Sequence, residues 1–164
     1  MMIHCFLALA FTAYGNLQGF PRQQSSNYTV LDSTQASSLV TQCSRWAPTI
    51  SSAWNPRDSD IANLEHNLGA IQGLTADSGS IIGVRIVNPS AFLRQYVGVV
   101  IGTKRFVYVN AFPLAEFEEW PSSVQRPDWR REPYIVCDGG ESYWGVLFDP
   151  VTCTFWGLAT NGIG

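Results

Sequence analysis

Two carboxylates lie within four residues of each other in the sequence Asp138-Gly139-Gly140-Glu141. Paired acidic side chains can perform general acid and base catalysis, as in glycoside hydrolysis, or hold a hard cation such as calcium. The same Asp-Gly-Gly sequence is typical of a hairpin turn, because glycine readily adopts positive φ. Asp138 and Glu141 are therefore candidates for a carboxylate-based hydrolase acting on a glycan, although the sequence favours a plain turn.

Other catalytic groups are scarce. His66 is the only histidine outside the first residues of the chain, and the residues around it predict a helix surface. The sequence contains no G-x-S-x-G nucleophile motif, no His and Cys spacing typical of zinc, and neither of the Gly-rich phosphate-binding motifs. We therefore predict no metal and no cofactor. We expect binding rather than catalysis, while the question of enzymatic activity stays open.

Aromatic residues in a proline-rich segment are candidates for binding. Residues 113–133 contain Trp120 and Trp129, and tryptophan dominates the contact energy of many protein interfaces. The alternative is that both indoles fold back and cover the sheet. Asn110 is unusual within a predicted strand, so it could bind a ligand, or it could end the strand by a hydrogen bond within its own turn. The candidate binding residues are Trp120, Trp129, Asn110, Asp138 and Glu141.

The start of the chain predicts export. Residues 3–14 form an apolar run that is too short to span a bilayer but has the length of a signal-peptide core. We expect residues 1–15 to be a signal peptide, although no Lys or Arg precedes the run, and a buried first strand or helix is the alternative. The mature chain would then be periplasmic or secreted, without an integral membrane segment.

One domain is expected for a chain of 164 residues. The polar residues 16–32 predict a flexible leader, and residues 33–164 a single domain. Hydrophobic residues make up 46% of the chain and charged residues 14%, which argues against disorder. The net charge is -3 and the basic residues are scattered, so we expect no nucleic-acid partner.

Three cysteines remain in the expected mature chain, Cys43, Cys137 and Cys153. In an oxidising compartment we predict a disulfide between Cys137 and Cys153, because they lie on neighbouring predicted strands. Cys43 would then be a free thiol. A pair of Cys43 with Cys137 or with Cys153 remains open, as does a set of three reduced core thiols.

Hydrophobic spacing predicts two helices followed by strands. Apolar residues recur at helical spacing over residues 35–46, and again from Asn55 to Gly69 or Gly73. Beyond residue 79, segments dense in Val, Ile, Tyr and Phe predict strands. These segments are residues 80–87, 95–101, 105–112, 134–137, 143–148 and 153–158. The fold class is therefore α+β, with two N-terminal helices packed on one face of a five- or six-stranded antiparallel sheet.

Several strand segments also carry a resemblance. RQYVGVV, RFVYVNAF, YIVCDGG, SYWGVLFDP and FWGLATNG resemble segments of a group of small, predicted-exported bacterial proteins of unknown function. The likeness covers residues 54–112 and 133–164. It implies a compartment and a fold type, and no activity. In that group a small residue stands at the position of Cys153, which argues against the predicted disulfide.

These features predict an exported binding module for an unknown protein or envelope component. An inhibitor of an envelope hydrolase, with an acidic loop entering a basic cleft, is one concrete form. A carboxylate-based glycan hydrolase that uses Asp138 and Glu141 is an alternative. A structural component of the envelope is another.

Overall fold

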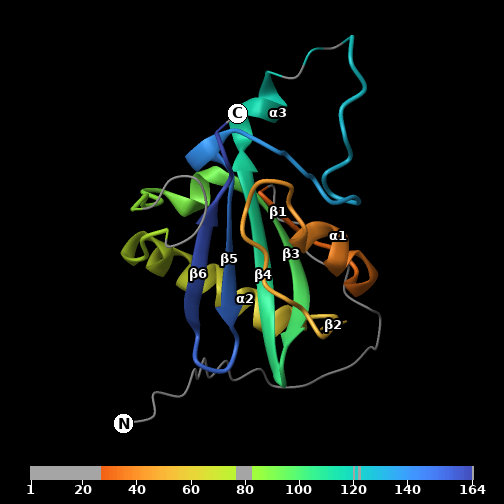
Figure 1. The fold of residues 1–164 in the computed structure, drawn as a ribbon. Helices are drawn as coiled ribbons and strands as arrows, with labels where there is room; N and C mark the ends of the chain where they lie inside the picture. Colours follow the sequence, from red (N-terminus) through yellow and green to blue (C-terminus); the bar gives the residue numbers. More distant parts are fainter. Residues whose placement is uncertain (1–26, 77–82, 120, 122, 164) are drawn as a thin grey trace, which may run out of the picture.

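The computed structural model of the chain describes residues 27–76, 83–119, 121 and 123–163. The expected signal peptide, most of the expected leader, the start of the predicted strand 80–87 and Trp120 lie outside these residues. The described part is a mixed α+β structure that centres on one six-stranded sheet (Figure 1). No helix among these residues is both long and apolar enough to cross a membrane.

The sheet is mostly antiparallel. Its strands are β1 (Tyr28–Val30), β2 (Ser52–Trp54), β3 (Phe92–Ile101), β4 (Lys104–Pro113), β5 (Trp144–Asp149) and β6 (Thr154–Thr160). Their order is β1-β3-β4-β5-β6, and β2 pairs with the part of β3 that follows its pairing with β1. The predicted α+β class is confirmed, but a wholly antiparallel sheet is wrong because β1 runs parallel to β3.

The parallel pair follows from the path of the chain. Parallel strands need a long crossover between them, and α1, β2 and α2 all lie between β1 and β3. Residues 28–30 were expected to belong to a flexible leader, whereas they form β1 of the sheet. The folded part therefore begins before residue 33.

The β3–β4 hairpin confirms a local prediction. Ile101 pairs with Lys104, so the connection consists of Gly102 and Thr103. Gly102 has a φ of 61°, a conformation that glycine adopts without a steric penalty. Ten residues on each strand make this the longest ladder of the sheet.

The helices are short, and they are interrupted by 3₁₀ turns. The described helices are η1 (Ser33–Gln35), α1 (Ala36–Val40), α2 (Asp58–Asn67), η2 (Leu68–Gly73), η3 (Pro89–Ala91), α3 (Leu114–Glu118) and η4 (Gly140–Ser142). The first predicted helix, 35–46, ends early at Val40. The second begins after Arg57, whose N–H donates to the Asp60 carboxylate at 2.9 Å. That carboxylate, and not Asn55, caps the helix.

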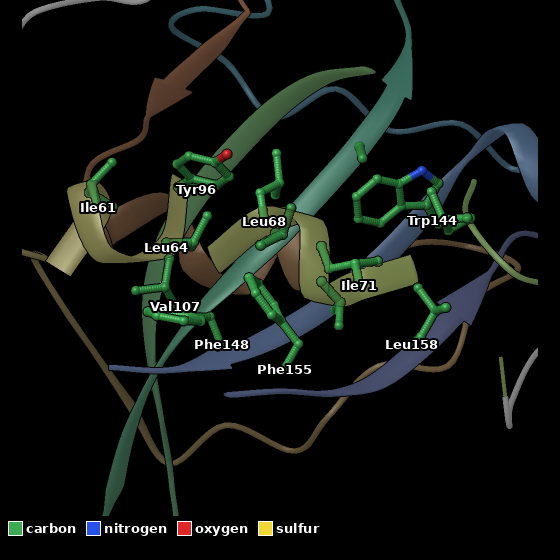
Figure 2. Close-up of a cluster of buried hydrophobic side chains, with 14 of the residues drawn as sticks. Ile61, Leu64, Leu68, Ile71, Tyr96, Val107, Trp144, Phe148, Phe155 and Leu158 are labelled. Carbon is green, nitrogen blue, oxygen red and sulfur yellow. The ribbon is translucent and has the colours of Figure 1, made fainter. Parts of the chain in front are cut away.

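One face of the sheet, called the first face here, is covered by α2 and η2 (Figure 2). The helical residues Ile61, Leu64, Leu68 and Ile71 are buried there. Their spacing is that of one helix face, as the sequence predicts. They pack against the side chains of Tyr96, Val107, Val109, Ala111, Trp144, Val146 and Phe148.

The opposite, second face is covered by α1. The cluster on this face comprises Leu31, Ala36, Leu39, Val40, Val97, Val99, Phe106, Tyr108 and Leu147. Successive strand residues point to opposite faces, so Tyr96 belongs to the first cluster and Val97 to the second. The prediction that both helices cover one face is wrong, because both faces of the central strands are apolar and each needs a cover.

Residues that follow α3 extend the cover of the second face. Trp129 and Tyr134 pack there with Leu93, Phe112 and Phe117. The predicted strand 134–137 is not a strand in the structure. The backbone of Tyr134 bonds to side chains of the sheet, as described below, and that of Val136 to the side chains of Gln42 and Asn161.

The structure contains a disulfide between Cys43 and Cys137, with their Cα atoms 4.9 Å apart. The predicted Cys137–Cys153 pair is therefore wrong. Cys137 precedes β5 and Cys153 follows it, so a strand of six residues, about 20 Å long, separates them. Cys153 is itself disulfide-bonded, and the described cysteines include no free thiol.

Candidate functional site

Asp138 and Glu141 are both exposed in the structure. The two glycines between them have positive φ, 95° at Gly139 and 58° at Gly140. A Cβ atom at Gly139 would lie 2.3 Å from the Tyr143 ring, so only glycine fits there. The Asp-Gly-Gly-Glu sequence thus builds a tight turn, and its carboxylates face solvent.

The carboxylate that the structure does place among other functional groups is Glu116 on α3. The hydroxyl of Tyr134 donates to Glu116 Oε1 at 2.5 Å, and the hydroxyl of Tyr143 donates to Oε2. Burial and the neighbouring carboxylate raise the pKa of both tyrosines. This group ties α3 to the segments on either side of the 138–141 turn. No sequence spacing indicated it, because its members come from three separate segments.

Trp129, a predicted binding residue, is 8% exposed. Its ring packs edge-on against Phe112, with centroids 5.7 Å apart, and against Phe117. The Arg130 guanidinium lies over the Trp129 ring, 4.2 Å from its centroid. Trp129 therefore belongs to the core, as in the fold-back alternative, and it does not form a contact surface. Trp120 lies outside the described residues.

Asn110 lies in the middle of β4 and is 3% exposed. Its Oδ1 accepts from Arg45 Nη2 at 2.5 Å, and its Nδ2 donates to Gln95 Oε1 at 3.1 Å and to the Tyr134 carbonyl at 2.9 Å. The interpretation that it ends a strand by bonding its own turn is wrong. Asn110 joins three segments on the second face, and its position is buried.

Gln95, directly opposite Asn110 on β3, completes this polar network. Its Nε2 donates to the carbonyl oxygens of Trp129 and Glu132 at 2.5 and 2.6 Å, and its Oε1 accepts from the Tyr134 N–H at 2.9 Å. A loop that crosses a sheet must have its backbone polar groups satisfied. One buried glutamine performs that role for residues 129–134.

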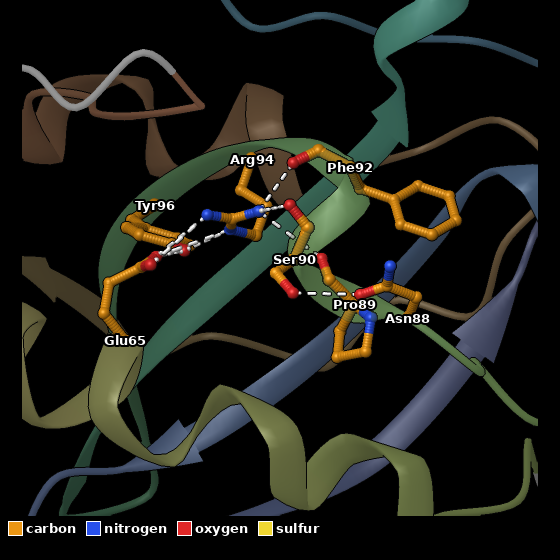
Figure 3. A network of polar contacts seen from close by, with 7 residues as sticks. All are labelled: Glu65, Asn88, Pro89, Ser90, Phe92, Arg94 and Tyr96. Carbon is orange, nitrogen blue, oxygen red and sulfur yellow. Dashed lines mark hydrogen bonds and ion pairs between the residues drawn. The ribbon is translucent and has the colours of Figure 1, made fainter.

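A second polar network lies on the first face (Figure 3). Arg94 Nη1 donates to the carbonyl oxygens of Ser90 and Phe92 at 3.2 and 2.6 Å, while its Nη2 lies 3.2 Å from Glu65 Oε2. The Tyr96 hydroxyl donates to Glu65 and accepts from Arg94 Nε at 2.8 Å. Burial raises the pKa of Tyr96 well above its ordinary value. The network holds α2 against the turn that precedes β3.

Two tryptophans that the sequence did not single out are exposed. Trp46 is 44% and Trp156 39% exposed, and together they are called the tryptophan surface here. The other exposed large apolar side chains of the described residues are aliphatic: Val87, Val124, Ile135, Val151 and Ile163. Side chains alternate between the two faces of a strand, so in the predicted strand 153–158 Trp156 points away from the face on which Phe155 is buried. This alternation is the sequence signal that could have predicted the exposure of Trp156.

The Trp46 ring lies against a β-bulge that directly follows Trp156 on β6. Trp156 pairs with Leu147, and the register then shifts before Ala159 pairs with Gly145. The extra residue on β6 is Gly157, with a φ of 66°. A Cβ atom on Gly157 would lie 3.5 Å from the Trp46 ring. Trp46 therefore covers the residue next to Trp156.

Each tryptophan is held by its neighbours. The Trp156 ring packs edge-on against Phe106, with centroids 5.2 Å apart, and Phe106 belongs to the second-face core. Trp46 lies three residues after Cys43, which is disulfide-bonded to Cys137, and directly after the buried Arg45. Trp156 is thus fixed on the sheet, and Trp46 belongs to a segment that a disulfide cross-links.

No known family model, curated protein or solved structure matches the chain. The resemblance to a group of exported bacterial proteins stays a prediction. No group of three or more His, Cys, Asp or Glu side chains that could hold a metal ion occurs in the part of the chain that the structure describes.

Proposed function

We propose that the chain is an exported binding module that contacts a partner protein through the tryptophan surface. The observation that carries this proposal is the exposure of Trp46 and Trp156, 44% and 39%, on the same face of the sheet. Tryptophan is the residue most enriched among interface positions that dominate binding energy. The proposed contact surface therefore lies on the sheet, whereas the sequence predicted it in the proline-rich segment.

The fixed position of the two indoles favours binding. Association costs free energy wherever a flexible side chain is immobilised. Trp156 is already packed on Phe106 and Trp46 already lies on Gly157, so little side-chain freedom is left to lose. Each indole also presents a large apolar area together with one N–H donor.

The disulfide supports export. Cys43 and Cys137 are cross-linked, and disulfides persist in oxidising compartments such as the periplasm or the extracellular space. An inhibitor of an envelope hydrolase is one concrete form of such a module, because the net charge of -3 suits a basic cleft.

The test uses the oxidised protein immobilised and exposed to an envelope extract. The captured protein is identified by mass spectrometry and purified, and its Kd is then measured for the parent and for a Trp46→Ser/Trp156→Ser variant. We expect the double substitution to raise Kd at least about thirtyfold, which is the effect of losing one dominant interface residue.

Val151→Ser is the matched control. Val151 is 79% exposed and lies in the turn between β5 and β6, so the substitution removes an exposed apolar side chain away from the bulge. It should leave Kd unchanged. The proposal is overturned if the double variant binds the partner as tightly as the parent does, with both variants unfolding at the parental urea concentration.

A further inference from the structure

The side chain of Arg45 is charged, buried and incompletely bonded. It is 5% exposed, and Nη2 donates to Asn110 Oδ1. Its Nε and Nη1 atoms are buried without a hydrogen-bond partner in the described part of the protein. Burial lowers the pKa of Arg45, yet arginine has an intrinsic pKa so high that it stays protonated.

No carboxylate compensates this charge within the described ranges. The ion pairs there join Arg57 to Asp60, Arg94 to Glu65 and Arg131 to Asp128. The groups around Arg45 that are engaged with it or with Asn110 are neutral amides and carbonyls. A buried charge without a counter-charge is strongly destabilising, and buried charges in proteins are normally paired.

A second buried donor lies beside Arg45. The Tyr108 hydroxyl is also without a partner among the described residues, and Tyr108 is 3% exposed. Both groups converge over Gly145 on β5. A Cβ atom there would lie 2.5 Å from Tyr108 Oη and 3.0 Å from Arg45 Nη1. An N–H and an O–H thus meet where β5 carries no side chain.

We propose that Arg45 and Tyr108 bind a small monovalent anion over Gly145, with chloride as the ion of matching chemistry. One negative charge balances one guanidinium, and an anion accepts hydrogen bonds from both unpaired donors at once. Charge-assisted hydrogen bonds of this kind are stronger than neutral ones. The inference is independent of the proposed function, since it requires neither tryptophan nor a partner protein.

A bound water molecule is the competing explanation, because water also accepts hydrogen bonds from buried donors such as those of Arg45 and Tyr108. Only bound chloride makes the thermal stability depend on which salt is present, so the two explanations can be separated.

The experiment measures chloride binding to the full oxidised chain. Chloride-35 NMR line broadening reports ion binding directly, and thermal unfolding in sodium chloride is compared with sodium gluconate at equal ionic strength. We expect the protein-induced broadening to saturate as chloride fills its site. We also expect a Tm that rises with chloride concentration, as for any ligand of the folded state.

Tyr108→Phe removes only the hydroxyl, and we expect the chloride affinity to fall about tenfold. Gly145→Ala places a methyl group 2.5 Å from Tyr108 Oη and 3.0 Å from Arg45 Nη1, so it displaces these donors and should abolish chloride binding. Tyr96→Phe is the control, because Tyr96 lies on the opposite face, and it should leave the chloride affinity unchanged.

A crystal grown in sodium bromide provides a readout that does not depend on stability. We expect an anomalous peak between Arg45 Nη1 and Tyr108 Oη. A water molecule at that position, equal unfolding in chloride and gluconate, or a chloride effect that survives both Tyr108→Phe and Gly145→Ala would each overturn the proposal.

Discussion

Gln95 on β3 and Asn110 on β4 lie directly opposite each other and are joined by a hydrogen bond of 3.1 Å from Asn110 Nδ2 to Gln95 Oε1. The two side chains use their remaining polar atoms on Arg45 and on the backbone of residues 129–134. A polar pair in the centre of the second face therefore holds a loop against the sheet.

Gln95→Ala should destabilise the protein by about 2–4 kcal/mol, because it leaves one buried carbonyl, one part-buried carbonyl and one buried N–H without a partner. Urea unfolding followed by circular dichroism measures the loss. Gln72→Ala makes the same change at an exposed position of η2 and should shift the free energy of unfolding by less than about 0.5 kcal/mol. Equal losses in the two variants would contradict the role assigned to Gln95.

The Cys43–Cys137 disulfide closes a loop of 94 residues, so its removal should cost about 3–5 kcal/mol. The Cys43→Ser/Cys137→Ser variant and the oxidised parent are compared by urea unfolding. Peptide mapping of the non-reduced protein provides the independent check. A cross-linked peptide containing Cys43 and Cys137 is expected, and one containing Cys137 and Cys153 would show the pairing to be wrong.

Tyr134 and Tyr143 should make stability fall at high pH. Burial and Glu116 raise their folded-state pKa above the ordinary value of 10.0. Their contribution is therefore fully present below pH 10, where both states hold the proton. It is lost as the pH rises further, because only the unfolded state releases the proton. Tyrosinate absorbance of the folded protein should show these two hydroxyls titrating later than exposed ones.

Glu116→Gln tests the cause of that delay. Removing the negative charge should move the titration of both tyrosines toward the ordinary range, although burial still holds it above that range. An unchanged titration curve in Glu116→Gln would show that the carboxylate does not act on them.

Gly139→Ala should destabilise the protein by about 1–3 kcal/mol, because φ is 95° and the new methyl group would overlap the Tyr143 ring. Gly69→Ala is the matched control, since a Cβ atom at Gly69 meets nothing within 4 Å and the residue lies in η2. The thermal unfolding of both variants is compared with that of the parent protein. A Gly139→Ala protein as stable as Gly69→Ala would contradict the turn geometry.

Local features of the fold followed from the sequence. The β3–β4 hairpin was predicted from two segments rich in Val, Tyr and Phe on either side of Gly102, and the second helix from apolar residues at helical spacing. Such features depend on residues close together in the chain, because turn conformation and helix periodicity are local properties.

The binding residues could not be predicted from the sequence in the same way. Trp129 was predicted to bind and is buried, while Trp46 and Trp156 are exposed. A tryptophan at a surface and one in a core have the same sequence signal, since the indole suits both. What separates them is the segment that packs on top, and that segment is distant in the sequence.

The sequence by itself determined the α+β class, the β3–β4 hairpin and the amphipathic helix α2. Each of these depends on residues that are close together in the chain. The tertiary structure decided that the helices cover opposite faces, that Cys43 pairs with Cys137, and that Arg45 lies buried beside Tyr108. These outcomes depend on how segments far apart in the chain share the two faces of one sheet. That sharing is set by the burial of the whole core and by no single stretch of residues.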